Sequence, residues 1–408
     1  MRVLFVSTLF PSDLRTYVHG VFKRMRLFVD AIKEIAQLDM LFYVRPDRDM
    51  SPCTVSKLQR SLSEHWEAGI RLTLCPKYEP AEPLSKWQLY GAGAVNFFRQ
   101  NGYLPTSGAR QVQAFEECLH RKPDAVFAEG LSSMCPPLLT RANLPPVFFD
   151  VNDIAHVVLL RGIDPLRGWR SKLVSYSHLP ALCWGERRAM RLAHRTFVCS
   201  ETDRKYLTRF WRLPGVVAVP NAVDITESLP VTPNPTVLFL GSYWYQPNVQ
   251  AAEFLLQKIW PQISRVVPEA KLIIAGPVPE YIPGYNHGIP GVEFTGFVDD
   301  LETLYRRSRV ICAPILSGGG TRLKIVEAAA YGKPIVATRL GAEGLDLRDG
   351  HELLLRDSAD AFAQACGQLF KDDDLCSRLG RAAHQAAVRQ YNRADITRMI
   401  QKHLQLQK

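Results

Sequence analysis

The stretch "SGGGTRLKIVEAAAYGKPIVAT", residues 317–338, joins three consecutive glycines to two cations and then to a carboxylate within an apolar run. The preceding residues, "RVICAPI" at 309–315, predict a strand, whereas "RLKIVEAAAYG" at 322–332 predicts a helix that stops before Gly332 and Pro334. The glycines therefore occupy a turn between a strand and a helix, and we expect Thr321 to be the N-cap residue of that helix.

Such a turn is suited to binding an anion. Three glycines leave backbone N–H groups uncovered, and the helix N-terminus adds roughly half a positive charge. Arg322 and Lys324 are expected about one and three positions into the helix. Unpaired, each cation would cost on the order of 0.3–1 kcal/mol against the helix dipole. A bound diphosphate would reverse the sign of that interaction.

Glu327 follows Gly320 by seven residues and Leu323 by four, so it lies on the helix face that continues the glycine turn. A carboxylate at that place can accept two hydrogen bonds from a diol such as a ribose. The alternative is an ion pair between Lys324 and Glu327 on a solvated face. The apolar neighbours of Glu327 favour a largely buried helix, in which a carboxylate has a specific partner.

Outward from this turn, apolar runs of strand length alternate with helix-like segments, which predicts parallel sheets covered by helices on both faces. The strand-like runs are "VLFVST", "LDMLFYV", "DAVFAEG", "PVFFDV", "RTFVCS", "VLFLGS", "AKLIIAGP", "VEFTGF", "RVICAPI" and "PIVATR". Prolines interrupt the pattern between residues 213 and 235. We therefore predict an α/β chain of two doubly wound, Rossmann-like domains, residues 1–212 and 213–390, followed by a helix at 391–408 that crosses back to the first domain.

Composition narrows the function classes. The chain has 408 residues, of which 47% are hydrophobic and 22% charged, and its formal net charge of +10 favours an acidic partner. Nucleic acid binding would rest on that charge alone, so we do not expect it. Nine scattered cysteines indicate reduced thiols in a cytoplasmic protein, without a zinc site. The apolar opening "MRVLFVSTLF" is interpreted as a buried first strand and not as a signal sequence, and no run is long enough to span a membrane.

Three segments of the second half carry a family resemblance: "VLFLGSYWYQPN", "TGFVDDLETLY" and "GGGTRLKIVEAAAYGKPIVATRLGAEGL". They resemble the nucleotide-sugar domain of glycosyltransferase family 4, retaining enzymes of the GT-B fold. "CSETDRKYL" and "VPNAVD" resemble the end of that family's first domain. The resemblance is strong over residues 196–357, and it implies two Rossmann-like domains that face each other across a cleft.

The resemblance assigns the donor site to the second domain. Glu327 matches the second Glu of the family's paired-glutamate signature, which binds the ribose, whereas Gly319 stands where the first Glu is usual. The family's Arg and Lys after the first strand are replaced by Ser242 and Asn248, so Arg322 and Lys324 are expected to neutralise the diphosphate. The donor-binding residues implied are Gly241, Ser242, Phe297, Val298, Gly318, Gly319, Gly320, Thr321, Leu323 and Glu327.

The first domain is expected to hold the acceptor. Its "YVHGVFKRMRLF" segment resembles the loop and first helix that approach the donor, which makes His19 and Gly20 candidates for the cleft. "FFDVNDIAH" ends a strand where relatives have a His that contacts the transferred sugar, and Asn152 stands at that position. Asp153 is our candidate for a polar group near the reacting carbon, and the alternative is that it caps a helix.

The implied reaction is retaining transfer of a hexosyl or pentosyl group from a nucleotide-diphosphate-sugar, without metal or cofactor, in which the enzyme mainly stabilises the leaving diphosphate. Arg322, Lys324 and Asp153 are the catalytic candidates. A lipid-linked oligosaccharide for surface polysaccharide is the expected acceptor, with a small soluble alcohol as the second choice. Two alternatives remain: a nucleotide-sugar epimerase of the same fold, or a non-catalytic nucleotide-sugar-binding partner of another transferase. A dehydrogenase is disfavoured because the G-x-G-x-x-G turn is missing.

One further expectation concerns a membrane. The helix "VFKRMRLFVDAIKEIA", residues 21–36, has apolar residues on one side and cations nearby, so it could lie on anionic lipid at the inner face of a membrane. The alternative is an ordinary first helix that packs inward on the sheet.

Overall fold

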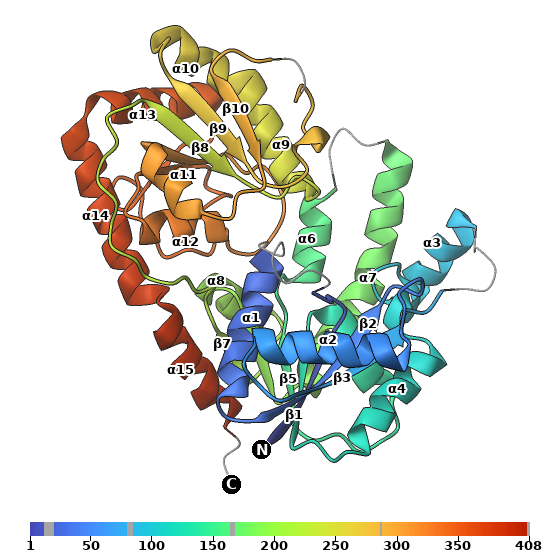
Figure 1. Cartoon of the computed structure of the whole chain (residues 1–408). Coiled ribbons are helices and arrows are strands. Elements are labelled where there is room, and N and C mark those ends of the chain that lie inside the picture. The colour runs from blue at the N-terminus through green and yellow to red at the C-terminus, as the bar shows by residue number, and fades with distance from the viewer. Residues whose placement is uncertain (12–19, 80–84, 164–167, 286–287, 406–408) are drawn as a thin grey trace. The chain divides into compact units, whose positions relative to one another are not determined.

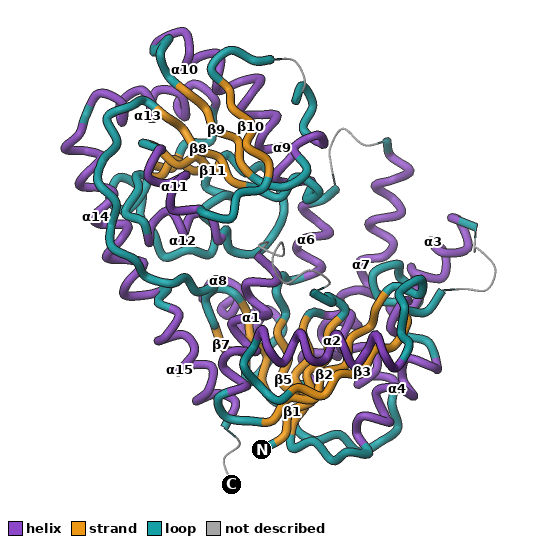
Figure 2. The backbone as a smooth tube through the Cα atoms, in the orientation of Figure 1, coloured by secondary structure: helices purple, strands orange, loops and turns teal. Residues whose placement is uncertain are grey.

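A computed structural model of the chain describes residues 1–11, 20–79, 85–163, 168–285 and 288–405. The chain divides into two compact units. The first comprises residues 1–219 and 397–408, and the second comprises residues 220–396. Each unit has its own sheet, as the separate groups of orange strands in Figure 2 show.

The first unit contains a parallel sheet of seven strands in the order β3-β2-β1-β4-β5-β6-β7. The strands are β1 (Arg2–Ser7), β2 (Gln37–Val44), β3 (Ile70–Pro76), β4 (Ala125–Glu129), β5 (Val147–Asp150), β6 (Arg195–Val198) and β7 (Val216–Ala218). Helices cover this sheet: α1 (Gly20–Lys33), α2 (Pro52–His65), α3 (Lys86–Val95), α4 (Ala109–Leu119), α5 (Cys135–Leu139), α6 (Ala155–Arg161), α7 (Trp169–Leu192) and α8 (Glu201–Phe210).

The second unit contains a parallel sheet of six strands in the order β10-β9-β8-β11-β12-β13. Its strands are β8 (Thr236–Leu240), β9 (Lys271–Ala275), β10 (Val292–Gly296), β11 (Val310–Ala313), β12 (Ile335–Ala337) and β13 (Leu354–Leu355). Its helices are α9 (Gln246–Phe254), α10 (Trp260–Val266), α11 (Leu301–Arg307), α12 (Leu323–Ala330), α13 (Ala359–Lys371) and α14 (Asp373–Gln390), and a π-helical turn at Leu255–Ile259 joins α9 to α10. The last helix, α15 (Arg393–Leu404), begins in the second unit and ends in the first.

Both sheets are wound in the way that the sequence predicts. The ten predicted runs all form strands, and the apolar opening is β1, buried at the centre of the first sheet. The sequence analysis did not identify β3, β7 or β13 as strands. The α/β class with two doubly wound, Rossmann-like units is therefore confirmed.

The expectation that the first helix lies on lipid is wrong. The apolar residues of α1 that would face a membrane are buried in the first unit: Phe22, Met25, Phe28, Val29 and Ile32. Phe28, for example, packs its ring 4.8 Å from that of Phe127 on β4, measured between centroids. The amphipathic pattern of α1 thus reflects packing on the sheet.

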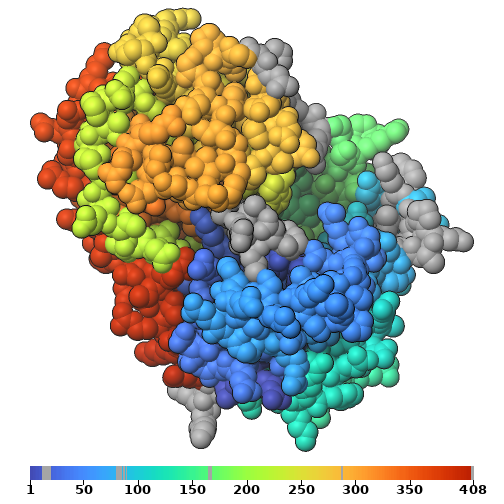
Figure 3. Space-filling model, in the orientation of Figure 1, coloured from blue at the N-terminus to red at the C-terminus, as the bar shows by residue number. Residues whose placement is uncertain are grey.

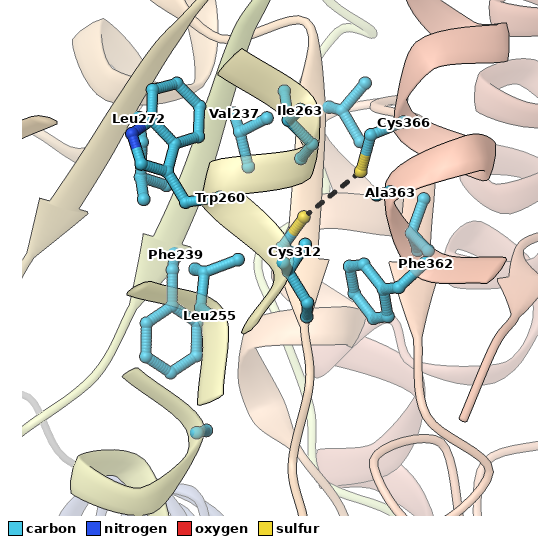
Figure 4. Packing of buried hydrophobic residues seen from close by; sticks show 14 of the residues in the cluster. Val237, Phe239, Leu255, Trp260, Ile263, Leu272, Cys312, Phe362, Ala363 and Cys366 are labelled. Atoms are coloured by element: carbon cyan, nitrogen blue, oxygen red, sulfur yellow. Dashed lines mark hydrogen bonds between the residues drawn. The ribbon is translucent and has the colours of Figure 1, made fainter. Parts of the chain in front are cut away.

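Two clusters of buried hydrophobic residues pack on the sheet of the second unit, and Figure 4 shows one of them. Phe239 and Val237 of β8 and Cys312 of β11 pack against Trp260 of α10 and Cys366 of α13. The sulfur atoms of Cys312 and Cys366 are 3.8 Å apart, and all nine cysteines are free thiols. This core fixes the positions of β8 and β11, whose carboxyl ends carry the candidate site.

Candidate functional site

The predicted donor residues of the second unit lie at one edge of its sheet. β8 and β11 are neighbours, and the strand order runs outward from them in opposite directions, so the loops that follow them flank the switch point of a doubly wound sheet. Gly241 and Ser242 follow β8, residues 314–322 follow β11, and Phe297 and Val298 follow β10. The topology therefore brings three segments that are distant in sequence to the same edge.

The glycine turn has a conformation that needs glycine. Gly318 and Gly320 have φ values of +93° and +68°, which side chains disfavour. A Cβ atom on Gly318 would also lie 2.9 Å from the Tyr245 hydroxyl oxygen and 3.1 Å from Cγ of Pro247. The turn is consequently packed against the start of α9, and its backbone passes close to the loop after β8.

Helix α12 begins at Leu323, and its N-cap residue is Arg322. The prediction of Thr321 as N-cap is therefore wrong. The Thr321 hydroxyl oxygen instead accepts a hydrogen bond of 2.8 Å from Nδ2 of Asn221, which is buried. Arg322 stands just before the helix and Lys324 is its second residue, one position earlier than we expected.

The Arg322 guanidinium closes the glycine turn. Its Nη2 donates to the carbonyl of Ser317 at 3.1 Å, and its Nη1 donates to the carbonyls of Gly319 and Gly320. The side chain is half-buried. It thus holds the turn in shape and places a full positive charge at the N-terminus of α12.

Lys324 joins α12 to the loop after β8. Its Nζ donates to Oδ1 of Asn248 at 2.9 Å and lies 4.4 Å from the centre of the Phe239 ring. Nδ2 of Asn248 in turn donates to the carbonyl of Ser242. Burial, and then the charge of Arg322, lower the pKa of Lys324 to about 7. An added anion would favour the protonated form, so this amine can gain a proton when an anion binds.

Glu327 lies one turn further along α12 and is half-buried. Burial, and then the Glu327 carboxylate, raise the pKa of Tyr305, whose ring stacks on that of Tyr331 with 4.5 Å between centroids. The side chain of Leu323, by contrast, belongs to the apolar core, so only its backbone can face a ligand.

Gly276, after β9, contacts the chain at the ends of both neighbouring strands, β8 and β10. Gly276 follows β9 with φ of +136°, and a Cβ atom there would lie 1.7 Å from the carbonyl oxygen of Gly241. Its N–H donates to the carbonyl of Gly296 at the end of β10. Phe297 and Val298 come directly after and are half-buried, and Val298 packs against the core. The ends of β8, β9 and β10 are therefore in direct contact through their backbone atoms.

The predicted site of the first unit is described only in part. Gly20 is the exposed first residue of α1, and His19 lies outside the described residues. Asn152 follows β5 in the left-handed region, with φ of +58°, and its buried Oδ1 has no hydrogen-bond partner among the described residues. Asp153 is half-buried, and since the N-cap residue of α6 is Ile154, the alternative role of Asp153 as a helix cap is wrong.

Sequence reasoning missed a pair of buried carboxylates at this edge of the first sheet. Asp150 forms a two-pronged ion pair with Arg24 of α1, at distances of 2.6 and 2.9 Å. Glu129, at the end of β4, accepts a hydrogen bond of 2.6 Å from the Ser7 hydroxyl, and burial raises its pKa to about 8. The only signal in the sequence is that each acid ends an apolar strand-like run.

His156 is committed to the structure of the first unit. Its Nδ1 lies 2.5 Å from the Glu186 carboxylate of α7, and its Nε2 lies 2.8 Å from the hydroxyl of Tyr206 of α8. The same carboxylate accepts the N–H of Ala155 at 2.6 Å. Both ring nitrogens are thus occupied in a network that fixes the start of α6, next to Asn152 and Asp153.

Comparison with known proteins agrees with the geometry of the second unit. Residues 234–372 match a family model described as "Glycosyl transferases group 1". The chain is 32% identical over 215 residues to a phosphatidyl-myo-inositol mannosyltransferase of Mycobacterium leprae, covering 48% of this chain and 56% of the relative. It is 34% identical over 115 residues to the lipopolysaccharide core biosynthesis glycosyltransferase LpsE of Rhizobium meliloti, covering 27% and 33%. The chain thus spans about half the length, or less, of these curated relatives.

Known structures share the fold over nearly the whole chain. A sucrose-phosphate synthase from Thermosynechococcus elongatus superposes with a TM-score of 0.70 at 16% identity, covering 98% of this chain and 97% of the other. Staphylococcus aureus TarM, in a complex with UDP, superposes with a TM-score of 0.67 at 11% identity and 99% coverage of both chains. The resemblance to glycosyltransferases is confirmed: residues 234–372 match the group 1 glycosyl transferase model, and the chain has the GT-B fold.

Proposed function

We propose that this protein is a retaining, metal-independent glycosyltransferase that moves a sugar from a nucleotide-diphosphate-sugar to an acceptor. The observation that carries the proposal is the pair of cations at the start of α12, next to a turn of three glycines of which two have positive φ. Two cations at a helix N-terminus are unfavourable unless an anion binds there. The printed names of relatives that act as glycosyltransferases support the same reading.

The diphosphate of the donor would bind to the backbone N–H groups of the glycine turn. Arg322 holds that turn through the carbonyls of Ser317, Gly319 and Gly320, so it acts by shaping the turn and by its charge. Lys324 supplies a proton-dependent charge beside it. As the bond to the sugar breaks, negative charge grows on the diphosphate, and these groups stabilise it without having to reorganise.

Glu327 would bind the ribose of the donor. It is half-buried on α12, one turn beyond the cations, and a carboxylate there can accept from both hydroxyls of a ribose. Gly319 lacks the carboxylate that the resemblance would put near the sugar, so contacts to sugar hydroxyls come from the backbone or from another side chain. Trp244, 50% exposed in the loop after β8, offers a flat apolar surface at the same edge.

We assign the acceptor to the first unit and propose a lipid-linked oligosaccharide. Asn152 and Asp153 follow β5 and stand just before α6, whose first two residues are held by Glu186 and Tyr206. The buried Oδ1 of Asn152 has no hydrogen-bond partner among the described residues, so a hydroxyl that reached it would satisfy this acceptor. Relatives named for the mannosylation of a phosphoinositide and for lipopolysaccharide core synthesis support a lipid-linked acceptor.

The test is turnover with a panel of nucleotide-sugars, with a pool of polyprenyl-linked saccharides as acceptor and a chelator present. We expect release of one nucleoside diphosphate together with sugar on the lipid. Glu327→Gln should raise the KM for the donor about 10- to 100-fold because it removes a charge-assisted hydrogen bond to the ribose. Glu302→Gln, at an exposed acid of α11, is the matched control and should leave the KM unchanged.

Three other results would contradict the proposal. Isomerised nucleotide-sugar without transfer would identify an epimerase. Donor binding without turnover across all acceptors would identify a non-catalytic partner. Turnover that disappears with the chelator and returns with a divalent cation would exclude the metal-independent mechanism.

A further inference from the structure

The first half of α7 is a helix without a buried side. None of residues 169–180 is buried, whereas the second half contributes Ala181, Leu182 and Gly185 to the core of the first unit. Yet this first half is not polar: Trp169, Leu173 and Tyr176 have exposed fractions of 69%, 61% and 52%. An apolar helix face in contact with water indicates a surface for a partner.

These side chains form one stripe along the helix. Trp169, Leu173 and Tyr176 are spaced by four and three residues, and Trp184, 53% exposed, follows eight residues later. At 3.6 residues per turn this spacing puts all four within about a quarter of the helix circumference. We call Trp169, Leu173, Tyr176 and Trp184 the α7 stripe. Figure 1 shows α7 as the long green helix whose first half extends from the sheet of its unit, and its side chains are seen at the surface in Figure 3.

The stripe is bordered by cations. The guanidinium of Arg170 lies 5.4 Å from the Trp169 ring, and that of Arg188 lies 5.2 Å from the Trp184 ring. Lys172, Arg187 and Arg191 add three more positive charges. The sole acid of α7 is Glu186, which is fully buried against His156. The exposed surface of this helix therefore carries five cations and no carboxylate.

The neighbouring helix packs on the side of α7 opposite to the stripe, because His178, which it contacts, lies about half a helical turn round from Trp169. α3 packs beside α7: Nε2 of Gln100 donates to the carbonyls of Gly93 and His178, and the His178 ring contacts the Tyr90 carbonyl. The sequence of α3, residues 86–95, has no Asp or Glu. Helix α3 therefore leaves the α7 stripe uncovered and brings no carboxylate to it.

The positive charge around the α7 stripe indicates which kind of partner can bind there. A second copy of this chain would bring five cations against five, which is repulsive. An acidic protein would satisfy the arginines but would not need two tryptophans, a tyrosine and a leucine in one row. Trp and Tyr rings bordered by Arg and Lys are the composition of helices that lie at the boundary between anionic lipid headgroups and acyl chains.

We propose that the α7 stripe docks this protein on an anionic membrane surface, with Trp169, Leu173, Tyr176 and Trp184 in the headgroup layer and the surrounding arginines on lipid phosphates. The inference rests on the exposure and charge of α7 and not on the proposed transfer reaction. It differs from the expectation for α1, whose apolar side is buried on the sheet.

The test is co-sedimentation of the full chain with phosphatidylcholine vesicles that do or do not contain phosphatidylglycerol, at low and high salt. We expect binding to the anionic vesicles only, weakened by salt. The double variant Trp169→Glu/Leu173→Glu should lower the partition coefficient at least about tenfold, because it replaces two inserted side chains by charges that phosphatidylglycerol repels. Tyr281→Glu, at a side chain 59% exposed in the second unit, is the matched control and should bind as the unaltered chain does.

The charge-only variant Arg187→Gln/Arg188→Gln separates the two contributions. It should reduce the salt dependence and the affinity for anionic vesicles while leaving the far-ultraviolet circular dichroism unchanged, since both residues are exposed. Equal binding to neutral and anionic vesicles, or binding that the glutamates do not change, would overturn the proposal. So would lipid-free self-association in sedimentation velocity that Leu173→Glu abolishes. Nucleotide binding, measured on the same preparations, reports separately on the donor site.

Discussion

The two sheets are wound in the same order, yet cations stand at the carboxyl edge of one sheet and buried carboxyl groups at that of the other. At the edge of the second sheet, Arg322 and Lys324 stand beside the glycine turn. At the edge of the first, Glu129 and Asp150 are buried at the ends of β4 and β5. The same topology thus places two cations at one edge, which suits an anion, and two buried carboxyl groups at the other.

The difference lies in the residues that end each strand. After β11, three glycines carry no side chain, so peptide N–H groups and cations determine the local charge. At the ends of β4 and β5, carboxyl groups occupy that place: Asp150 is paired with Arg24, and burial raises the pKa of Glu129 to about 8, so Glu129 is mostly protonated at neutral pH. A doubly wound sheet therefore provides an edge, and the strand-end residues decide which ligand can use it.

The largest expected effect is at Gly318. Gly318→Ala puts a Cβ atom 2.9 Å from the Tyr245 hydroxyl in a backbone conformation with φ of +93°, so the turn must change shape. We expect nucleoside diphosphate affinity, measured by calorimetry, to fall more than about 100-fold. Gly350→Ala is the matched control: it also has positive φ, but nothing lies within 4 Å of its added Cβ. Equal affinity of the two variants would remove the glycine turn from the site.

Lys324→Met tests the positive charge at the edge of the second sheet. Because the pKa of Lys324 is about 7 in the free protein, most of these amines are neutral at pH 8 and gain a proton when a diphosphate binds. Calorimetry in buffers of different ionisation enthalpy should show uptake of nearly one proton. The variant should lose that uptake and bind about 10- to 100-fold more weakly.

The exposed Lys258→Met is the control for this change and should keep both the affinity and the uptake. Undiminished proton uptake in Lys324→Met would show that another group titrates.

Glu129→Gln tests the buried carboxyl group at the edge of the first sheet. The folded-state pKa of Glu129, about 8, lies above its ordinary value of 4.5, so the folded protein keeps a proton that the unfolded chain releases. The free energy of unfolding should therefore fall as pH rises from about 4.5 to about 8, by about 1–4 kcal/mol. The variant has no ionisable group there and should lose that slope in urea titrations at pH 5 and pH 8.

Glu64→Gln, at an exposed acid of α2, is the control. A slope that Glu129→Gln preserves would place the titration elsewhere. Nucleotide affinity should not change in either variant.

The smallest effect is expected at Asn221. Its Nδ2 donates to Thr321 at the end of the glycine turn, and Asn221→Ala removes that one hydrogen bond. We expect a loss of about 1 kcal/mol in unfolding free energy and a drop of about threefold to tenfold in nucleotide affinity. Thr321→Val, which removes the acceptor instead, should give the same result. A change in stability with no change in affinity would mean that the turn does not depend on this bond.

Local pattern was sufficient to predict most of the fold. Long apolar runs such as those of β1 and β8 have the length and composition of buried parallel strands, and alternation with helices fixes the class. β13 has two residues and β7 three, too few to form a pattern. For α1, the same amphipathic pattern fits packing on a sheet and lying on a membrane, so periodicity could not decide between them.

The candidate site was predictable in residue type but not in contacts. The glycines, Arg322, Lys324 and Glu327 are adjacent in sequence, so their chemistry could be inferred together. Lys324, however, contacts Asn248, which lies 76 positions away, and that pairing depends on the neighbouring positions of β8 and β11. Thr321 was a reasonable N-cap by residue type, but its hydroxyl is bound to Asn221. The burial that raises the pKa of Glu129 exists only after the sheet has formed.

The central claim is that the edge of the second sheet, and not that of the first, binds the diphosphate. Hydrogen exchange of the whole chain, measured by mass spectrometry with and without the nucleoside diphosphate that binds, tests it directly. We predict slower exchange in peptides covering residues 317–327 and 241–249. Slower exchange at residues 128–134 and 150–154 with no change at 317–327 would contradict the account.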